Sequence, residues 1–147
     1  MTTSIISIAD YFGKWIDHKD ATPEIKQDAE AFLRDVNELL QDALNGGVSL
    51  VINPHTGNYV SGQTYGGFRP QDCPQGAPQS SHKVGRGVDV YDPHDDLDGW
   101  LCVYEAGGGA NNKLKHFGLY REAPEDTVGW LHLTNRAPKS GKQTFNP

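Results

Sequence analysis

Cysteine is scarce in this chain of 147 residues, and long apolar stretches are absent. Two cysteines, Cys73 and Cys102, are too few for a disulfide-stabilised scaffold, so we expect two free thiols, with a single bridge between them as the alternative. No apolar run approaches the roughly 20 residues of a membrane-spanning helix, which argues against membrane insertion. The first eight residues lack the basic and apolar regions of a signal peptide, so we expect production in the cytoplasm.

Positive charge is also in deficit. Thirteen lysines and arginines stand against 19 aspartates and glutamates, which gives a formal net charge of −6 at pH 7. Proteins that bind nucleic acid carry a basic surface that neutralises phosphates. The sequence offers no basic stripe of that kind, and we therefore expect no nucleic-acid partner.

What the chain does contain is a change of hydrophobic period near residue 47. Apolar residues recur at helical spacing over 4–16 and again from the Thr22-Pro23 cap to about residue 45. Beyond residue 47, apolar and polar residues alternate in 48–52, 87–91 and 129–133, as in half-buried strands. Glycine and proline dominate 61–79, which predicts a long irregular loop.

These segments predict one α+β domain over residues 1–147. Its helical part would cover 1–47, the sheet and loops that carry the site would cover 48–135, and 136–147 would form a tail. We expect an antiparallel sheet with the N-terminal helices packed against it. A less favoured alternative is that these helices bind a partner, because apolar helical stripes usually belong to a core.

Two histidines and one aspartate in the second half form a candidate metal site. His82 and Asp89 flank a short glycine-bearing segment, and His132 lies near the C-terminus. Imidazole nitrogen and carboxylate oxygen are good zinc ligands. Three protein ligands with one open position are typical of a catalytic zinc rather than a structural one. We therefore predict one Zn²⁺ ion.

Strand alternation supports this ligand set. Within 87–91, Asp89 points away from the valines on either side of it, and within 129–133, His132 points away from the flanking leucines. If the two strands are antiparallel neighbours, Asp89 and His132 meet on one face while the valines and leucines share the core. The glycines that follow His82 permit a tight bend that returns its ring to the same face.

The segment around the first histidine resembles a known signature. Ser80, His82, Gly85 and Asp89 fit the pattern S-x-H-x-x-G-x-A-x-D, with Gly87 where alanine is usual. This pattern is that of the zinc D-Ala-D-Ala carboxypeptidases and endopeptidases, peptidase family M15.

Two further segments are similar to that family's motifs and follow in the same order. Ser61-Gly62 and Phe68-Arg69-Pro70 resemble its S-G-[YF]-R-P segment with an insertion, and Trp130-Leu131-His132 resembles its closing aromatic-x-His motif. The resemblance runs from about residue 48 to residue 133. It implies the α+β fold of the DD-peptidases and of hedgehog domains.

The resemblance also implies an activity and roles for particular residues. It implies a zinc peptidase that hydrolyses D-amino-acid-containing peptide bonds in bacterial peptidoglycan, and we favour an endopeptidase that cuts crosslinks. Arg69 would stabilise the oxyanion or bind a substrate carboxylate, and Ser61 and Ser80 would help to bind substrate. A chain without a signal peptide would then act in the periplasm or cell wall in the manner of a phage endolysin.

The general base is open at this stage. Gly129, three residues before the last zinc histidine, stands where many family members carry the catalytic acid. Glu122, Glu125 and Asp126 precede the His132 strand, and proximity in sequence favours Glu125 and Asp126. The alternative is that all three are surface charges, in which case the chain is a catalytically impaired zinc-binding interaction module or a virion component.

Overall fold

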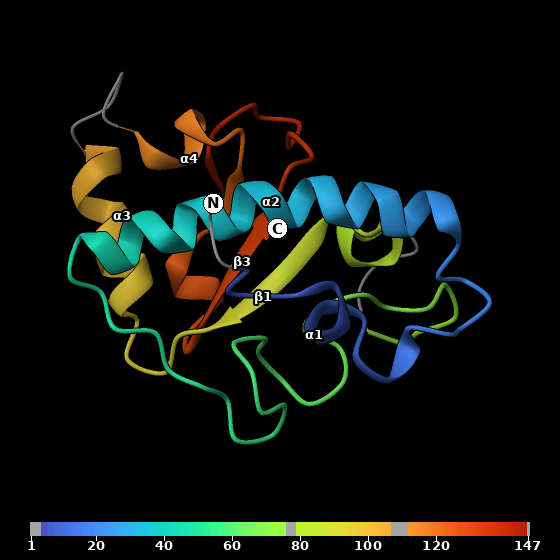
Figure 1. Ribbon diagram of the computed structural model, residues 1–147. Helices are drawn as coiled ribbons and strands as arrows, with labels where there is room; N and C mark the ends of the chain where they lie inside the picture. Colours follow the sequence, from blue (N-terminus) through green and yellow to red (C-terminus); the bar gives the residue numbers. More distant parts are fainter. Residues whose placement is uncertain (1–3, 76–78, 107–111, 147) are drawn as a thin grey trace.

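The computed structural model describes residues 4–75, 79–106 and 112–146 and combines helices with one small sheet (Figure 1). This confirms the predicted α+β class. Helix α2 lies across one face of the sheet, while α3 and α4 lie near the C-terminal end of α2 (Figure 1). In chain order the elements are α1 (Ile8–Phe12), η1 (Gly13–Trp15), α2 (Pro23–Asn45), η2 (Ser81–Val84), β1 (Gly87–Tyr91), α3 (Asp96–Ala106), α4 (Lys113–His116), β2 (Tyr120–Glu122), η4 (Pro124–Asp126), β3 (Trp130–Thr134) and β4 (Thr144–Phe145).

Helix α2 begins and ends where the sequence predicts. Thr22 Oγ1 accepts a hydrogen bond from the Ile25 amide at 3.2 Å, which satisfies a donor that the first turn leaves unpaired. Gly46 follows the last helical residue, and its amide donates to the Asp42 carbonyl at 2.9 Å. The buried apolar face consists of Ala29, Phe32, Leu33, Val36, Leu39, Leu40 and Ala43. Each large side chain among them contributes about 1.5–3 kcal/mol by leaving water.

The N-terminal helix is shorter than the predicted 4–16. Ser7 Oγ accepts from the Asp10 amide at 3.0 Å and Asp10 Oδ2 accepts from the Ser7 amide at 3.1 Å, so a capping box starts the helix at Ile8. Gly13, at φ 52°, ends it after five residues. The Ile6 amide, before the cap, donates instead to the buried Asn37 side chain of α2 at 2.8 Å.

The sheet has the order β1-β3-β2-β4 and is mixed rather than purely antiparallel. Strands β1 and β3 pair antiparallel, as predicted, and β2, which was not predicted, pairs antiparallel with β3, but β4 pairs parallel to β2. The prediction of an all-antiparallel sheet is therefore wrong at this edge. The sequence did not predict β4 because two residues are too few to show alternation. These residues lie within 136–147, which was predicted to be a tail.

The predicted strand over 48–52 is also wrong. This segment has no strand pairing, and Val51 and Ile52 are 37% and 54% exposed. Asn53 organises a turn here instead: its amide donates to the Asn58 carbonyl and its side chain to the Val60 carbonyl. The chain meets the sheet only after this turn, where Val60 forms an isolated bridge to Val90 and the Tyr91 amide donates to the Tyr59 carbonyl at 2.8 Å.

The structure also bears on membrane-spanning helices and on the two cysteines. Within 4–75, 79–106 and 112–146, no helix has the length and apolar character that a membrane crossing needs. Cys73 is buried, Cys102 is exposed, and both are free thiols, as the sequence predicts.

Candidate metal centre

Strands β1 and β3 hold the first two ligands directly opposite each other. Their register pairs Asp89 with His132, while the neighbouring valines and leucines on both strands are 0% exposed. The period-two alternation of strands sends every second side chain to the same face. Both residues therefore lie on the face away from the core, as the sequence predicts.

His82 reaches this face from the turn before β1. It lies in η2, where Ser80 Oγ accepts a hydrogen bond from its amide at 3.3 Å. Gly85 then adopts the left-handed conformation (φ 76°), which most residues disfavour and which turns the chain into β1. At Gly87, a Cβ atom would collide with the Ser81 hydroxyl, so glycine fits here better than the alanine of the motif.

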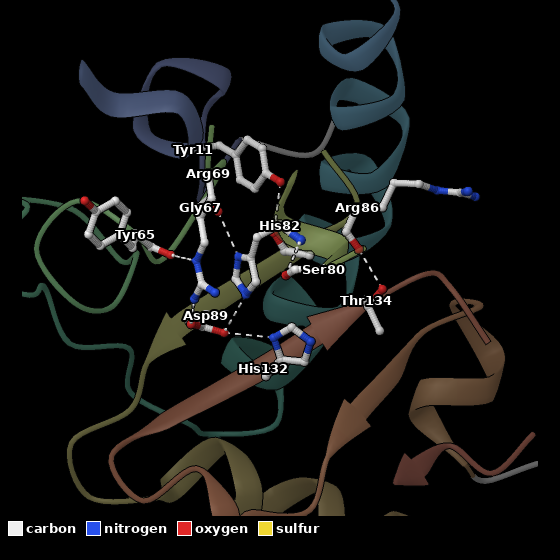
Figure 2. Close-up of polar contacts among 11 residues, drawn as sticks. Tyr11, Tyr65, Gly67, Arg69, Ser80, His82, Arg86, Asp89, His132 and Thr134 are labelled. Atoms are coloured by element: carbon white, nitrogen blue, oxygen red, sulfur yellow. Dashed lines mark hydrogen bonds and ion pairs between the residues drawn. The ribbon is translucent and has the colours of Figure 1, made fainter. Parts of the chain in front are cut away.

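The three side chains converge on one point (Figure 2). Asp89 Oδ1 lies 2.8 Å from His132 Nδ1 and 3.3 Å from His82 Nε2, and one ligand atom from each residue lies within 4.8 Å of the others. Ligand atoms around a tetrahedral zinc lie roughly 3.3–3.6 Å apart. The His82–Asp89 spacing fits this value, and the His132 ring would need to move back by roughly half an ångström.

A backbone carbonyl fixes the orientation of His82. His82 Nδ1 lies 2.8 Å from the Gly67 carbonyl oxygen, which accepts the proton of that nitrogen. The lone pair then resides on Nε2, the atom that faces Asp89, and this tautomer is the one that binds a metal.

The N-terminal helix holds the segment that supplies this carbonyl. The Phe68 amide donates to the Tyr11 carbonyl at 3.1 Å, and the Tyr11 hydroxyl donates to the Gly87 carbonyl at 2.9 Å. A Cβ atom at Gly67 would collide with the Tyr11 backbone, so this close approach requires glycine.

Arg69 approaches the centre from the long loop. Its Nη2 lies 3.4 Å from Asp89 Oδ2, and its Nε donates to the Tyr65 carbonyl at 2.7 Å (Figure 2). A guanidinium has five donors. Those not used by Asp89 and Tyr65 remain for another group in the site.

The charges of the centre favour cation binding. Burial alone would raise the pKa of Asp89, but the neighbouring His82 and His132 side chains hold that pKa well below its usual range. Burial lowers the pKa of His82 and outweighs the opposing pull of Asp89. An ionised carboxylate beside a neutral imidazole is the protonation state that zinc requires.

Two hollows meet at the centre and share Arg69, Asp89 and Trp130. One, of about 510 Å³, extends past Ser80, His82 and His132 toward Phe145 and the segment after β3. The other, of about 410 Å³, extends along 61–66. We refer to the two adjoining hollows together as the central groove; Asp89 lines both of them, whereas His82 and His132 line only the first.

The structure brings most of the predicted site residues to this groove. Ser80 lines the first hollow and Ser61 the second, and the Ser61 amide also donates to the Asp89 carbonyl at 2.8 Å. Glu125 and Asp126 are different: they lie exposed in η4 and do not line either hollow. The geometry therefore does not support the prediction that Glu125 or Asp126 is the general base.

Unlike Glu125 and Asp126, Glu122 lines the central groove. It lies at the end of β2, lines the first hollow with His82, Asp89 and His132, and is half-buried. Burial raises its pKa, against the lowering effect of His132. The signal in the sequence that could have identified Glu122 is the alternation in 120–122, where Arg121 is buried and Glu122 points to the other face. Three residues are too few for this alternation to predict a strand.

A second group of carboxylates has a structural explanation. Asp92, Asp95 and Asp98 also lie close together. However, Asp92 accepts hydrogen bonds from the Leu97 and Asp98 amides at the start of α3, and Asp98 pairs with the buried Arg121 at 2.7 Å. These contacts are those of a capped helix terminus and a buried ion pair.

Comparison with known proteins found no matching family model, no similar curated protein and no similar solved structure.

Proposed function

We propose that this protein is a zinc-dependent peptidase that hydrolyses D-amino-acid-containing peptide bonds of peptidoglycan. The observation that carries the proposal is the His82–Asp89–His132 cluster in an open groove. Two imidazoles and one carboxylate form the ligand set of a catalytic rather than a structural zinc. The motif resemblance around these ligands supports the substrate class.

In this proposal His82 Nε2, Asp89 Oδ1 and His132 Nδ1 hold the metal. Bound zinc would polarise the scissile carbonyl and acidify a water molecule. The Gly67 carbonyl keeps His82 in the ligating tautomer, and Arg69 restrains Asp89 from the opposite side.

Glu122 is the general base that the geometry supports best. It shares the first hollow with the ligands, and its raised pKa brings it closer to neutral pH, where a base transfers protons most efficiently. It would take the proton of the attacking water and return it to the departing amine. Arg69 would donate to the carbonyl oxygen as negative charge develops there.

The groove favours an endopeptidase. A carboxypeptidase needs only a closed end for the substrate terminus, whereas the central groove consists of two hollows that adjoin at Asp89. A chain that extends on both sides of the scissile bond fits this shape, and crosslinked stem peptides are such chains. In the same proposal, the protein acts in the periplasm or cell wall, where peptidoglycan lies.

The test is digestion of purified peptidoglycan by the zinc-loaded protein, with muropeptides identified by mass spectrometry and zinc content measured in parallel. His82→Ala and Asp89→Asn should lose both zinc and cleavage, while Asp126→Asn, an exposed control, should keep both. Stoichiometric zinc without cleavage would favour a zinc-binding interaction module. Folded protein that binds no zinc would reject the metal site itself.

A further inference from the structure

The two halves of the central groove differ in charge. Among the described residues, those that line the half along 61–66 carry no charge apart from the shared Arg69 and Asp89. The half beyond His132 adds Glu122 and Arg136. Arg136 is therefore a cation that distinguishes one end of the groove from the other.

Backbone and side-chain contacts hold Arg136 at this end. It follows β3, and its amide donates to Thr134 Oγ1 at 3.1 Å, while that hydroxyl donates to the Arg86 carbonyl at 2.7 Å. Its Nη1 donates to the carbonyl of Gln79, which lines the same hollow, at 2.8 Å. This bond restrains the side chain, which reduces the entropy lost when it binds a ligand.

Arg136 has unused binding capacity. One of its five N–H donors is used by Gln79, and no carboxylate in the described part of the chain lies within salt-bridge distance of it. In contrast, the Arg69 guanidinium pairs with Asp89, and the Arg121 guanidinium pairs with Asp98. Arg136 is thus a groove-lining guanidinium whose charge is not matched by a neighbouring acid.

We propose that Arg136 binds a free carboxylate of the substrate and that this end of the groove selects peptides carrying one. The inference deepens the proposed function and depends on it. A guanidinium recognises a carboxylate through two parallel hydrogen bonds, and such charge-assisted bonds are roughly twice as strong as bonds between neutral groups. Because the protein's net charge of −6 repels anions, a local cation favours binding of an anionic peptide here.

A purely structural role predicts something different. If Arg136 only ties the segment after β3 to Gln79, its loss would affect all substrates equally. If it binds a carboxylate, its loss would affect only substrates that carry that group.

The experiment uses two synthetic crosslinked peptides that differ only in a carboxylate or a carboxamide beyond the scissile bond. Wild type should show a KM about ten- to a hundredfold lower for the acid, a difference of about 1.4–2.8 kcal/mol, which is comparable to one hydrogen bond between charged groups. Arg136→Gln should lose this preference through KM with little change in kcat, and Arg136→Lys should restore part of it. Lys139→Gln, an exposed cation outside the groove lining, should keep it.

Binding separates this inference from the proposed function. Affinities of both peptides for zinc-loaded Glu122→Gln protein, measured by calorimetry, report recognition without turnover. If wild type cleaves neither peptide but the acid still binds more tightly through Arg136, the peptidase proposal fails and the carboxylate site stands. Equal affinity for acid and amide, or a preference that survives Arg136→Gln, would overturn the site even if cleavage is observed.

Discussion

Glu122→Gln should abolish most of the hydrolysis while leaving the metal centre intact. Glu122 lines the hollow that contains the three ligands but supplies none of the converging ligand atoms. A positioned general base contributes roughly 10²–10⁴-fold to rate, or about 3–5 kcal/mol of barrier. The amide of glutamine keeps the size of the side chain and cannot accept the proton, so kcat should fall by that factor and zinc content should not change.

The matched controls are the two acids that follow Glu122 in sequence. Glu125→Gln and Asp126→Asn remove the same charge from exposed positions outside the groove. Initial rates of crosslink cleavage, followed by liquid chromatography and mass spectrometry, should stay within about twofold of wild type for both, since surface charges act weakly. Near-normal activity of Glu122→Gln, or loss of activity in either control, would refute the assignment of the base.

The pH profile gives an independent check on Glu122. A base acts in its ionised form, and burial raises the pKa of this carboxyl. The acidic limb of kcat/KM should therefore lie above the ordinary range of a glutamate, with activity increasing as pH rises through it. Zinc content measured at each pH separates this limb from loss of metal, and Glu122→Gln should lack the limb.

Three further variants test the centre and the fold. Asp89→Asn should weaken zinc binding by at least about a hundredfold in a chelator competition, because even groups that only orient ligands are worth about 10- to 100-fold; unchanged zinc affinity would remove this carboxylate from the ligand set. Arg121→Met should lower the free energy of unfolding by about 3–5 kcal/mol in urea titrations, because it leaves the Asp98 charge buried, and adding Asp98→Leu should recover most of that loss; additive losses would contradict a buried pair. Gly99→Ala, at an exposed position inside α3, should stabilise the protein by about 0.5–1 kcal/mol, whereas Gly118→Ala, at φ 69°, should destabilise it; the reverse order would contradict the backbone geometry.

The sequence predicted that Asp89 and His132 lie opposite each other on one face because this placement depends on a local rule. Alternation in 87–91 and 129–133 determines which side chains are buried, and burial of the valines and leucines leaves Asp89 and His132 on the other face. Helix α2 was predictable for the same reason, since its cap and its stripe are both encoded within a few turns.

The features that sequence missed depend on distant partners. The alternating segment 48–52 finds no neighbouring strand, while the two residues of β4 become a strand only because β2 offers a free edge. Glu122 enters the groove because β2 pairs with β3, whereas proximity along the chain pointed to Glu125 and Asp126. Short segments carry too little pattern to reveal such pairings.

The contacts of Tyr11 determine which segments a shortened version of this domain must keep. Through its carbonyl and its hydroxyl, this one residue secures both the strand that bears Asp89 and the loop whose oxygen orients His82. A fragment that contains only the segments of His82, Asp89 and His132 would lack these hydrogen bonds, even though it keeps all three residues. Transplanting the centre into another scaffold therefore requires carrying over the first helix as well.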